Sequence, residues 1–314
     1  MKYTVNKMIE NRLPKVSIIL VNWMQAALTA SCLKSLNQIS YPNTEIIVVD
    51  NGSCDGSVER LRAEFPEIRI IENGRNLGYT GGNNAGMLAA TGNYFLLLNN
   101  DTEVAPDFID PMIHLAESDT EIGAVSPKIV YYDHPDTIQY AGGGKIDLTR
   151  GRISWRGWMQ KDDGRFGEAV ETTLLHGAAL LVKRCVVEKV GLLNEHFFAY
   201  YEEIDWSLSI RKLGYSIYFM PKSLVLHKES MTVKKDNPLR VFLMNRNRIY
   251  LSRIHTGFWQ HLFFIHYLLG VSLSINLIRF LSKKRIDLVM AYCKGIIAGF
   301  RNRDIQSKKY LKWR

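Results

Sequence analysis

The first hundred residues alternate between short apolar runs and segments whose apolar residues recur at helical spacing. The apolar runs cover 16–22, 45–50, 68–71 and 94–98 and are rich in Ile, Val and Leu, as buried strands are. Helical spacing covers 25–36, 58–65 and 83–90. Strands that alternate with helices predict an α/β fold with a mostly parallel, Rossmann-like central sheet and flanking helices.

The pattern continues less regularly to residue 227 and then becomes helical. It predicts helices over about 106–117, 185–190 and 202–213, and strands near 125 and over 129–132, 217–220 and 224–227. The segment 139–168 lacks periodicity, which predicts loops and short strands, and 172–182 is apolar. We therefore expect an N-terminal extension (1–14), an α/β domain (15–237) and a helical C-terminal region (238–314).

The composition is that of a folded protein, with 46% hydrophobic and 23% charged residues. Four cysteines lie far apart without a Cys-x-x-Cys pair, which argues against a structural zinc site and a disulfide framework and fits a reducing compartment. Residues 1–14 carry charges but no apolar core, so we expect no secretory signal there.

The formal net charge of +9 is unevenly distributed along the chain. Residues 1–227 hold 22 Lys and Arg against 27 Asp and Glu, a net charge of −5, whereas residues 228–314 hold 18 against 4, a net charge of +14. The basic character therefore belongs to the C-terminal region. A basic region can meet nucleic acid or an anionic membrane surface.

The apolar content of the C-terminal region favours the membrane. A mostly apolar stretch, 258–281, begins with aromatic residues and is followed by Lys283-Lys284-Arg285. It is marginal for a spanning helix, which needs about 20 apolar residues, and fits a helix lying in the interface on the cytoplasmic face. Core helices packed on the body are the alternative. No nucleic-acid recognition module is evident, so we expect no nucleic-acid partner.

Two predicted strands end in a carboxylate. Asp50 closes the second strand, and Asp101 follows the strand that ends in Asn99-Asn100. In parallel sheets ligands bind beyond the carboxyl ends of the strands, where an acid can hold a ribose, a base or a divalent cation. The alternative is structural: Asp50 as a turn residue that caps the next helix, and Asp101 as a helix N-cap.

The segment 76–86 is rich in Gly and Asn and is expected to be a turn that leads into a helix. Glycines allow the close approach of backbone N–H groups, and a helix N-terminus attracts phosphate. The segment has neither the Gly-x-Gly-x-x-Gly spacing nor a Gly-Lys-Ser/Thr of a Walker loop. A plain loop explains it as well.

Three carboxylates, Glu202, Glu203 and Asp205, stand at the start of a predicted helix beside Tyr200 and Trp206. The helix macrodipole favours acids at this end, which is one explanation. Three acids in an apolar setting are costly to ionise together, so one would have a raised pKa and suit a general base. His227, which closes an apolar run, is either a structural histidine or a ligand.

Taken together, several segments resemble the family 2 glycosyltransferases, especially their bacterial rhamnosyltransferase-like branch. The resemblance covers about 15–227, and it depends on the order and spacing of the segments. They are 16–23 (VSIILVNW), 48–57 (VVDNGSCDGS), 76–86 (NLGYTGGNNAG), 97–101 (LLNND), 176–184 (HGAALLVKR) and 200–208 (YYEEIDWSL).

The resemblance implies a GT-A fold and an inverting sugar transfer from a nucleotide-diphosphate donor. It implies Mg²⁺ or Mn²⁺ bound by Asp101 and His227, with Asn99-Asn100-Asp101 standing where many relatives have Asp-x-Asp. The implied donor-nucleotide residues are Asn22, Asp50, Asn51, Asp55, Asn76, Gly78, Asn83 and Asn100. The implied acceptor-side residues are His176, Gly177 and Trp206.

In relatives the base is the Asp of a Glu-Asp pair, so the resemblance points to Glu203, with Glu202 and Asp205 in reserve. The branch suggests dTDP-L-rhamnose as donor, with UDP-sugars next. A saccharide or polyprenyl-linked acceptor for a surface polysaccharide fits the apolar C-terminal region, and a homodimer is possible. The alternative is an inactive, membrane-associated protein that binds sugar nucleotides or acts as a scaffold.

Overall fold

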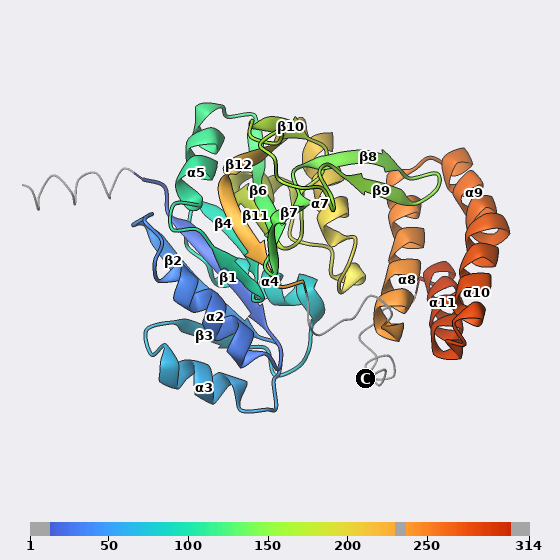
Figure 1. The fold of residues 1–314 in the computed structure, drawn as a ribbon, viewed down its shortest axis with the longest axis horizontal. Helices are drawn as coiled ribbons and strands as arrows, with labels where there is room; N and C mark the ends of the chain where they lie inside the picture. The colour runs from blue at the N-terminus through green and yellow to red at the C-terminus, as the bar shows by residue number, and fades with distance from the viewer. Residues whose placement is uncertain (1–12, 230–236, 303–314) are drawn as a thin grey trace, which may run out of the picture.

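The computed structural model describes residues 13–229 and 237–302, which form an α/β body and a group of C-terminal helices (Figure 1). The main sheet has the strand order β10-β12-β6-β11-β4-β1-β2-β3, with β5 paired to β12 and β7 paired to β6. Its strands are β1 (Val16–Asn22), β2 (Thr44–Asp50), β3 (Arg69–Glu72), β4 (Tyr94–Asn99), β5 (Thr102–Val104), β6 (Ile122–Tyr131), β7 (His134–Tyr140), β10 (Val170–Thr172), β11 (Ala179–Lys183) and β12 (Ser216–His227).

The predicted fold class is confirmed. Strands β1 to β4 pair in parallel, as do β6 and β12, while β11 runs antiparallel between β4 and β6. The sheet is therefore mixed and mostly parallel. The register pairs Asn22 with Asp50 and Val21 with Asn99, so the polar ends of β1, β2 and β4 meet at one edge.

Helices cover both faces of the sheet, because residues of each strand alternate between them. Along β1, Ile18 and Leu20 face one core, whereas Ile19 faces the other. The first core also takes residues of α2 (Ala26–Leu36), α3 (Ser57–Glu64) and α5 (Ile109–Ser118). The second takes residues of α4 (Gly78–Ala89), α6 (Arg184–Val190) and α7 (Glu202–Lys212).

Several predicted boundaries differ from the structure. The expected turn at 76–82 is wrong, since α4 already begins at Gly78, whose positive φ of 74° starts the helix. The glycines of α4 let it lie close on the sheet: a Cβ at Gly86 would come within 2.4 Å of Ile19. The predicted strands 217–220 and 224–227 form one bulged strand, β12, and α5 begins at Ile109 rather than near Pro106.

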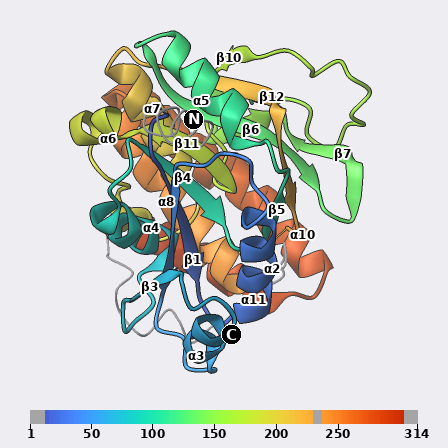
Figure 2. The ribbon, with the colours of Figure 1, turned by 90° about the vertical axis from the view of Figure 1, so that its left-hand side faces the viewer.

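The C-terminal helices share a core of their own and also pack on the body. They are α8 (Pro238–His255), α9 (Phe258–Tyr267), the π-helical turn Leu268–Ser272, α10 (Leu273–Ser282) and α11 (Ile286–Phe300). Helices α8 and α11 cross closely, since a Cβ at Gly295 would lie 2.5 Å from a backbone oxygen of Phe242. Figure 2 views the molecule with α2 in front and α8, α10 and α11 behind the sheet.

A hairpin of β8 (Gly143–Asp147) and β9 (Arg152–Trp155) reaches from the body toward α8 and α9 (Figure 1). Its turn touches these helices, because a Cβ at Gly151 would meet Phe264 at 3.0 Å and Arg248 at 3.7 Å. The hairpin therefore joins the α/β body to the helical region, on the side away from β3.

Helices α9 and α10 form one continuous helix, Phe258–Ser282, which is long and apolar enough to cross a membrane by length and composition. Only 17% of the most apolar 18-residue stretch of this helix is buried in the protein. Large apolar side chains that remain exposed on α9, α10 and α11 include Phe258, Trp259, Phe263, Ile275, Ile278, Leu281, Ile286, Met290 and Ile297. The exposed Lys283 and Lys284 follow α10 directly. An apolar surface of this extent, edged by lysines, suits a membrane interface.

Candidate active site

A cleft of about 1250 Å³ opens at the carboxyl edge of the sheet, between β1, β4, α7 and α8. It brings together most of the predicted site residues, although they come from distant parts of the chain. Those that line it are Asn51, Asn76, Gly78, Asn100, Asp101, His176, Gly177, Glu202, Glu203 and His227. The position agrees with the general placement of ligand sites in open α/β sheets.

The remaining nucleotide-side residues lie outside this lining and are hydrogen-bonded within the protein. The carboxylate of Asp50 accepts from Asn22 Nδ2 at 2.8 Å, Ser53 Oγ at 2.6 Å and Ser53 N at 2.8 Å. The exposed Asp55 accepts from Ser57 at the start of α3. Asn83 donates to the Tyr79 carbonyl inside α4. Direct contact of Asn22, Asp50, Asp55 or Asn83 with a nucleotide therefore stays a prediction.

Asn51 and Asn100 present polar groups to the cleft from a rigid support. Asn51 Nδ2 donates to the Gly78 carbonyl at 2.8 Å, and its Oδ1 accepts from Asn73. Asn100 Nδ2 donates to Thr29 Oγ1 at 3.0 Å. Asn76 Oδ1 accepts from the Gly78 amide at 2.8 Å, which fixes the start of α4 beside the cleft.

Asp101 and His227 face each other across the junction of β5 and β12. Asp101 Oδ1 lies 3.1 Å from His227 Nε2, and His227 Nδ1 lies 2.7 Å from Gln139 Oε1. The backbone amide of Lys228 donates to the Asp101 carbonyl at 2.9 Å, so strand pairing holds the two residues together. Both side chains are more than 90% buried.

This pair fits a divalent cation in part. An oxygen and an imidazole nitrogen are suitable ligands for Mn²⁺, and a histidine held through its other ring nitrogen is typical of metal ligands. Within 13–229 and 237–302, no three His, Cys, Asp or Glu side chains gather closely enough to form a complete metal site. A cation here would take its other ligands from diphosphate oxygens and water, as Mg²⁺ does in nucleotide sites.

Glu202 and Glu203 line the opposite wall of the cleft, in the first turn of α7. One oxygen of each carboxylate, Oε2, is buried and has no hydrogen-bond partner among residues 13–229 and 237–302. Burial raises the pKa of Glu203 to about 7. Burial, and then the charge of Glu203, raise the pKa of Glu202 well above its usual value. Around neutral pH Glu202 is therefore protonated, and Glu203 is the member of the pair that ionises first.

Asp205 and Trp206 follow on the same helix but are absent from the lining of the cleft. Asp205 Oδ1 instead lies 2.6 Å from His255 Nε2 of α8. Trp206 is buried in the core beneath the sheet and donates its Nε1 hydrogen to the Gly191 carbonyl at 3.0 Å. The structure thus gives these two side chains packing partners rather than access to a substrate.

His176 and Gly177 lie between the two walls. His176 Nδ1 accepts from the Ala178 amide at 3.1 Å, and burial lowers the pKa of His176 to about 3, so its ring is neutral. Gly177 accepts from the Tyr79 hydroxyl at 2.7 Å. A Cβ at Gly177 would come within 4.0 Å of both Glu202 and Glu203, so glycine leaves space beside the acids.

The backbone that leads into α7 is strained. Phe198, Tyr200 and Tyr201 all have positive φ, at 65°, 68° and 76°, although none is glycine. Each such residue costs about 1–3 kcal/mol and persists only where the surroundings hold it, often at functional sites. This loop, 198–201, sets the start of the helix that presents Glu202 and Glu203.

The residues that hold this loop were not predicted from the sequence, because they belong to the basic C-terminal region. Asn247 of α8 is fully buried, and its Nδ2 lies 2.8–2.9 Å from the carbonyl oxygens of Phe197, Ala199 and Tyr200. The neighbouring Arg246, also fully buried, donates to the His196 carbonyl at 2.5 Å. Helix α8 is therefore part of the site's framework. No pattern in the sequence of α8 indicated this role.

A mixed α/β sheet whose cleft pairs an Asp–His site with opposing carboxylates is the architecture of a GT-A glycosyltransferase. Residues 17–191 match the model of glycosyl transferase family 2, and the chain belongs to this family. The match ends before α7, so it does not include Glu203 or His227.

Relatives of assigned activity are distant. The N-acetylglucosaminyl-diphospho-decaprenol L-rhamnosyltransferase of Mycobacterium tuberculosis is 26% identical over 251 residues, which cover 73% of this chain and 81% of that enzyme. The low-salt glycan biosynthesis hexosyltransferase Agl10 of Haloferax volcanii is 27% identical over 307 residues, covering 95% of this chain and 94% of that enzyme. A match to an uncharacterized Sinorhizobium fredii protein spans only 27% of that protein.

A solved structure has the same fold. The mannosyltransferase PcManGT from Pyrobaculum calidifontis, in complex with GDP-Man and Mn²⁺, aligns with a TM-score of 0.58 over 94% of this chain and 89% of that chain. The sequence identity is 15%, so the likeness concerns the fold alone. The family match makes the chain a nucleotide-sugar glycosyltransferase, and the structural likeness shows that its fold is GT-A.

Proposed function

We propose that this protein transfers L-rhamnose from dTDP-L-rhamnose, with inversion at the anomeric carbon, to a saccharide carried on a polyprenyl diphosphate. The observation that carries the chemistry is Glu203, whose carboxylate lines the cleft with an unpartnered oxygen and a pKa of about 7. A base with this pKa is half deprotonated at neutral pH and can accept a hydroxyl proton. The mycobacterial relative supports the choice of sugar and acceptor.

In the proposed reaction, Glu203 accepts the proton of an acceptor hydroxyl as its oxygen attacks the anomeric carbon. The bond from that carbon to the diphosphate breaks on the opposite face, and the nucleoside diphosphate leaves with the electron pair. The new glycosidic bond then has inverted configuration. Glu202 stays protonated beside Glu203, because burial, and then the charge of Glu203, raise its pKa.

Asp101 and His227 would hold Mg²⁺ or Mn²⁺, which would stabilise negative charge on the departing diphosphate. The donor nucleotide would lie along Asn51, Asn76 and Asn100, at the carboxyl ends of β1, β2 and β4. The acceptor would enter between α7, α8 and the β8–β9 hairpin, past His176 and Gly177. The aromatic residues Tyr200 and Tyr201 line the same wall as the acids.

We further propose that 15–237 forms the catalytic domain and that the region from residue 238 attaches it to the cytoplasmic face of the membrane. The exposed apolar side chains of Phe258–Ser282 and the adjacent lysines support this attachment. A polyprenyl acceptor would be reached at that surface, for the synthesis of a cell-surface polysaccharide.

The test is turnover of dTDP- and UDP-sugars by the purified protein with Mg²⁺ or Mn²⁺, measured as release of nucleoside diphosphate. We expect release from dTDP-L-rhamnose above that from UDP-sugars, and its loss on chelation of the metal. Turnover of another sugar alone would replace the proposed donor. Tight donor binding without release, with or without polyprenyl-diphosphate saccharides, would favour an inactive sugar-nucleotide-binding protein instead.

A further inference from the structure

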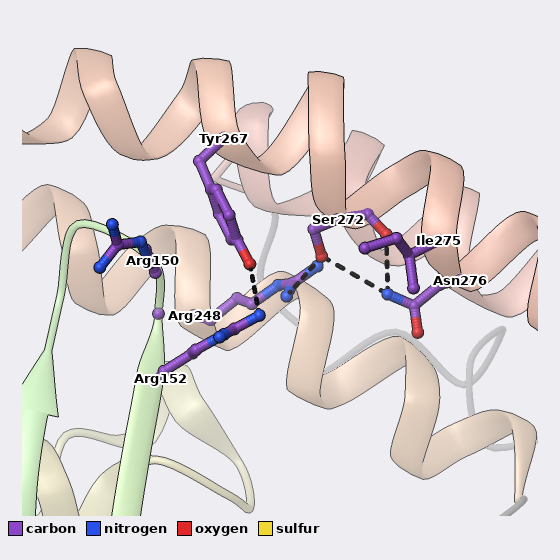
Figure 3. A pocket seen from close by; sticks show the side chains of 8 residues that line it. Arg150, Arg152, Arg248, Tyr267, Ser272, Ile275 and Asn276 are labelled. Carbon is purple, nitrogen blue, oxygen red and sulfur yellow. Dashed lines mark hydrogen bonds between the residues drawn. The ribbon is translucent and has the colours of Figure 1, made fainter.

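A second, smaller cavity of about 180 Å³ lies beside the cleft, between the turn of the β8–β9 hairpin and helices α8 to α10 (Figure 3). It is lined by Arg150, Gly151, Arg152, Arg248, Tyr267, Ser272, Ile275 and Asn276. Gly151 and Arg152 also line the large cleft. The two cavities therefore adjoin at the hairpin turn.

The cavity is cationic, and two of its arginines contact neutral groups. Arg152 donates to the Tyr267 hydroxyl at 2.8 Å. Arg248 donates to Ser272 Oγ at 3.2 Å and to the Tyr292 hydroxyl at 2.7 Å, and its Nε is buried without a partner. Among the described residues, neither forms an ion pair with a carboxylate, whereas Arg150 pairs with Asp147.

Arg152 and Arg248 bring two guanidinium groups to one cavity, and none of the residues that line it is acidic. Such a cavity is suited to bind an anion. Arginine presents its N–H donors as a planar fork that matches the oxygens of a phosphate. The partners of Arg248 hold its fork in advance: Ser272 Oγ lies 3.0 Å from the Tyr292 hydroxyl, and Asn276 donates to the Ser272 carbonyl at 2.7 Å. Little side-chain freedom then remains to be lost when an anion binds.

The cavity lies where a lipid phosphate would be expected. Ile275 lines it and is also 55% exposed on the apolar side of α10. A lipid chain on this side of α9 and α10 would place its phosphate beside Arg152 and Arg248. Groups attached beyond the phosphate would pass the hairpin turn into the large cleft, toward Glu203.

We propose that Arg152 and Arg248 bind the diphosphate of a polyprenyl-diphosphate-linked saccharide, so that its sugar reaches the catalytic cleft. This inference deepens the proposed function and rests on it. It assigns the acceptor's anchor to the junction of the hairpin and the C-terminal helices, separate from Asp101 and His227, which would serve the donor's diphosphate.

Binding of farnesyl diphosphate, measured by calorimetry with a metal chelator present, tests the site without turnover. The chelator disfavours metal-dependent binding of the probe's diphosphate at Asp101 and His227. We expect binding to weaken about tenfold or more in Arg152→Gln, whose side chain is exposed, and in Arg248→Lys. Arg60→Gln, on the exposed side of α3, is the matched control and should bind like the unchanged protein.

Two further probes separate the possible ligands. Farnesol should bind at least tenfold more weakly than farnesyl diphosphate, and equally in all variants, since it lacks the anion. Vesicles of phosphatidylcholine with phosphatidylglycerol should bind equally to all variants. Vesicle binding that falls in Arg152→Gln, together with farnesyl diphosphate binding that does not, would assign the site to phospholipid headgroups and overturn the proposal.

Unchanged farnesyl diphosphate binding in both arginine variants would also overturn it, and would leave the arginines as a joint between hairpin and helices. Melting temperatures of the variants identify any loss of folding. If donor turnover fails while the arginine-dependent binding holds, the error lies in the proposed reaction and not in this site. If turnover succeeds and the binding fails, only the acceptor site is wrong.

Discussion

The two walls of the cleft differ in how completely their polar groups are hydrogen-bonded. On the wall formed by the strand ends, Asn51, Asn100 and Asp101 each have hydrogen-bond partners. Asp50, outside the lining, accepts three more hydrogen bonds. On the α7 wall, Glu202 and Glu203 each keep a buried oxygen without a partner, behind a strained loop. Satisfied polar groups make a rigid binding surface, whereas unsatisfied buried acids are destabilising and reactive. The comparison assigns binding to the first wall and chemistry to the second.

The largest effect is expected from Glu203→Gln. It keeps the size of the side chain and removes the base, so kcat should fall about 10²- to 10⁴-fold while donor binding stays unchanged. Glu188→Gln, on the exposed side of α6, is the control. Turnover that survives in Glu203→Gln would move the base to Glu202.

Asp101→Ala should lower kcat about 10²-fold and weaken the dependence of the rate on Mn²⁺, because one of the two protein ligands is lost. The rate is measured across a Mn²⁺ titration, beside Asp107→Ala as an exposed control. An unchanged titration curve would show that the cation, if needed, is held elsewhere.

The rate should depend on pH through Glu203. Its pKa of about 7 means that the deprotonated base declines below this value, so kcat should fall about tenfold per pH unit there and level off above it. Glu203→Gln should remove this dependence from its residual activity. A rate that is flat between pH 5 and 8 would contradict the assignment.

Asn247→Ala tests whether α8 holds the strained loop. It leaves three carbonyls of residues 197, 199 and 200 without their donor, so Glu203 should be displaced and kcat should fall about tenfold with little change in donor KM. Asn245→Ala on the same helix is the matched control, because among the residues that the structure describes Asn245 Nδ2 donates only to the Val241 carbonyl of its own helix. A purely structural role would lower the melting temperature and leave the rate per folded molecule and its pH profile unchanged.

The smallest effects concern stability, and they should have opposite signs at the strand ends and at the start of α7. Asp50→Ala removes the acceptor of three hydrogen bonds from Asn22 and Ser53 and should lower the free energy of unfolding by about 1–3 kcal/mol. Glu203 has a raised pKa in the folded state, so folding becomes less favourable as pH rises from about 4.5 to about 7. Glu203→Gln should therefore raise the melting temperature at pH 8 but not at pH 4. Thermal unfolding at both pH values measures this. A melting temperature at pH 8 that falls in Glu203→Gln, as it should in Asp50→Ala, would contradict the comparison.

Much of this site followed from the sequence, because strand ends and helix starts are local features. The apolar runs and the polar residues after them located Asn51, Asn100 and Asp101 at one edge of the sheet. Helical geometry also explains why Asp205 leaves the cleft: two residues after Glu203, it points about 200° around the helix. The same argument does not explain Trp206, which follows Glu203 by about one helical turn and so starts from nearly the same side of α7. Its position in the core is decided by tertiary packing.

By itself, the sequence determined the alternation of strands and helices, the acids that follow them and the basic, apolar character of the C-terminal region. Periodicity and charge act within a few residues, so they can be recognised without the fold. The tertiary structure alone decided that α8 holds the loop before Glu203 and that Arg152 meets Arg248 beside the cleft. Those contacts join residues about 50 to 100 positions apart, and their partners are selected by packing, which no local pattern records.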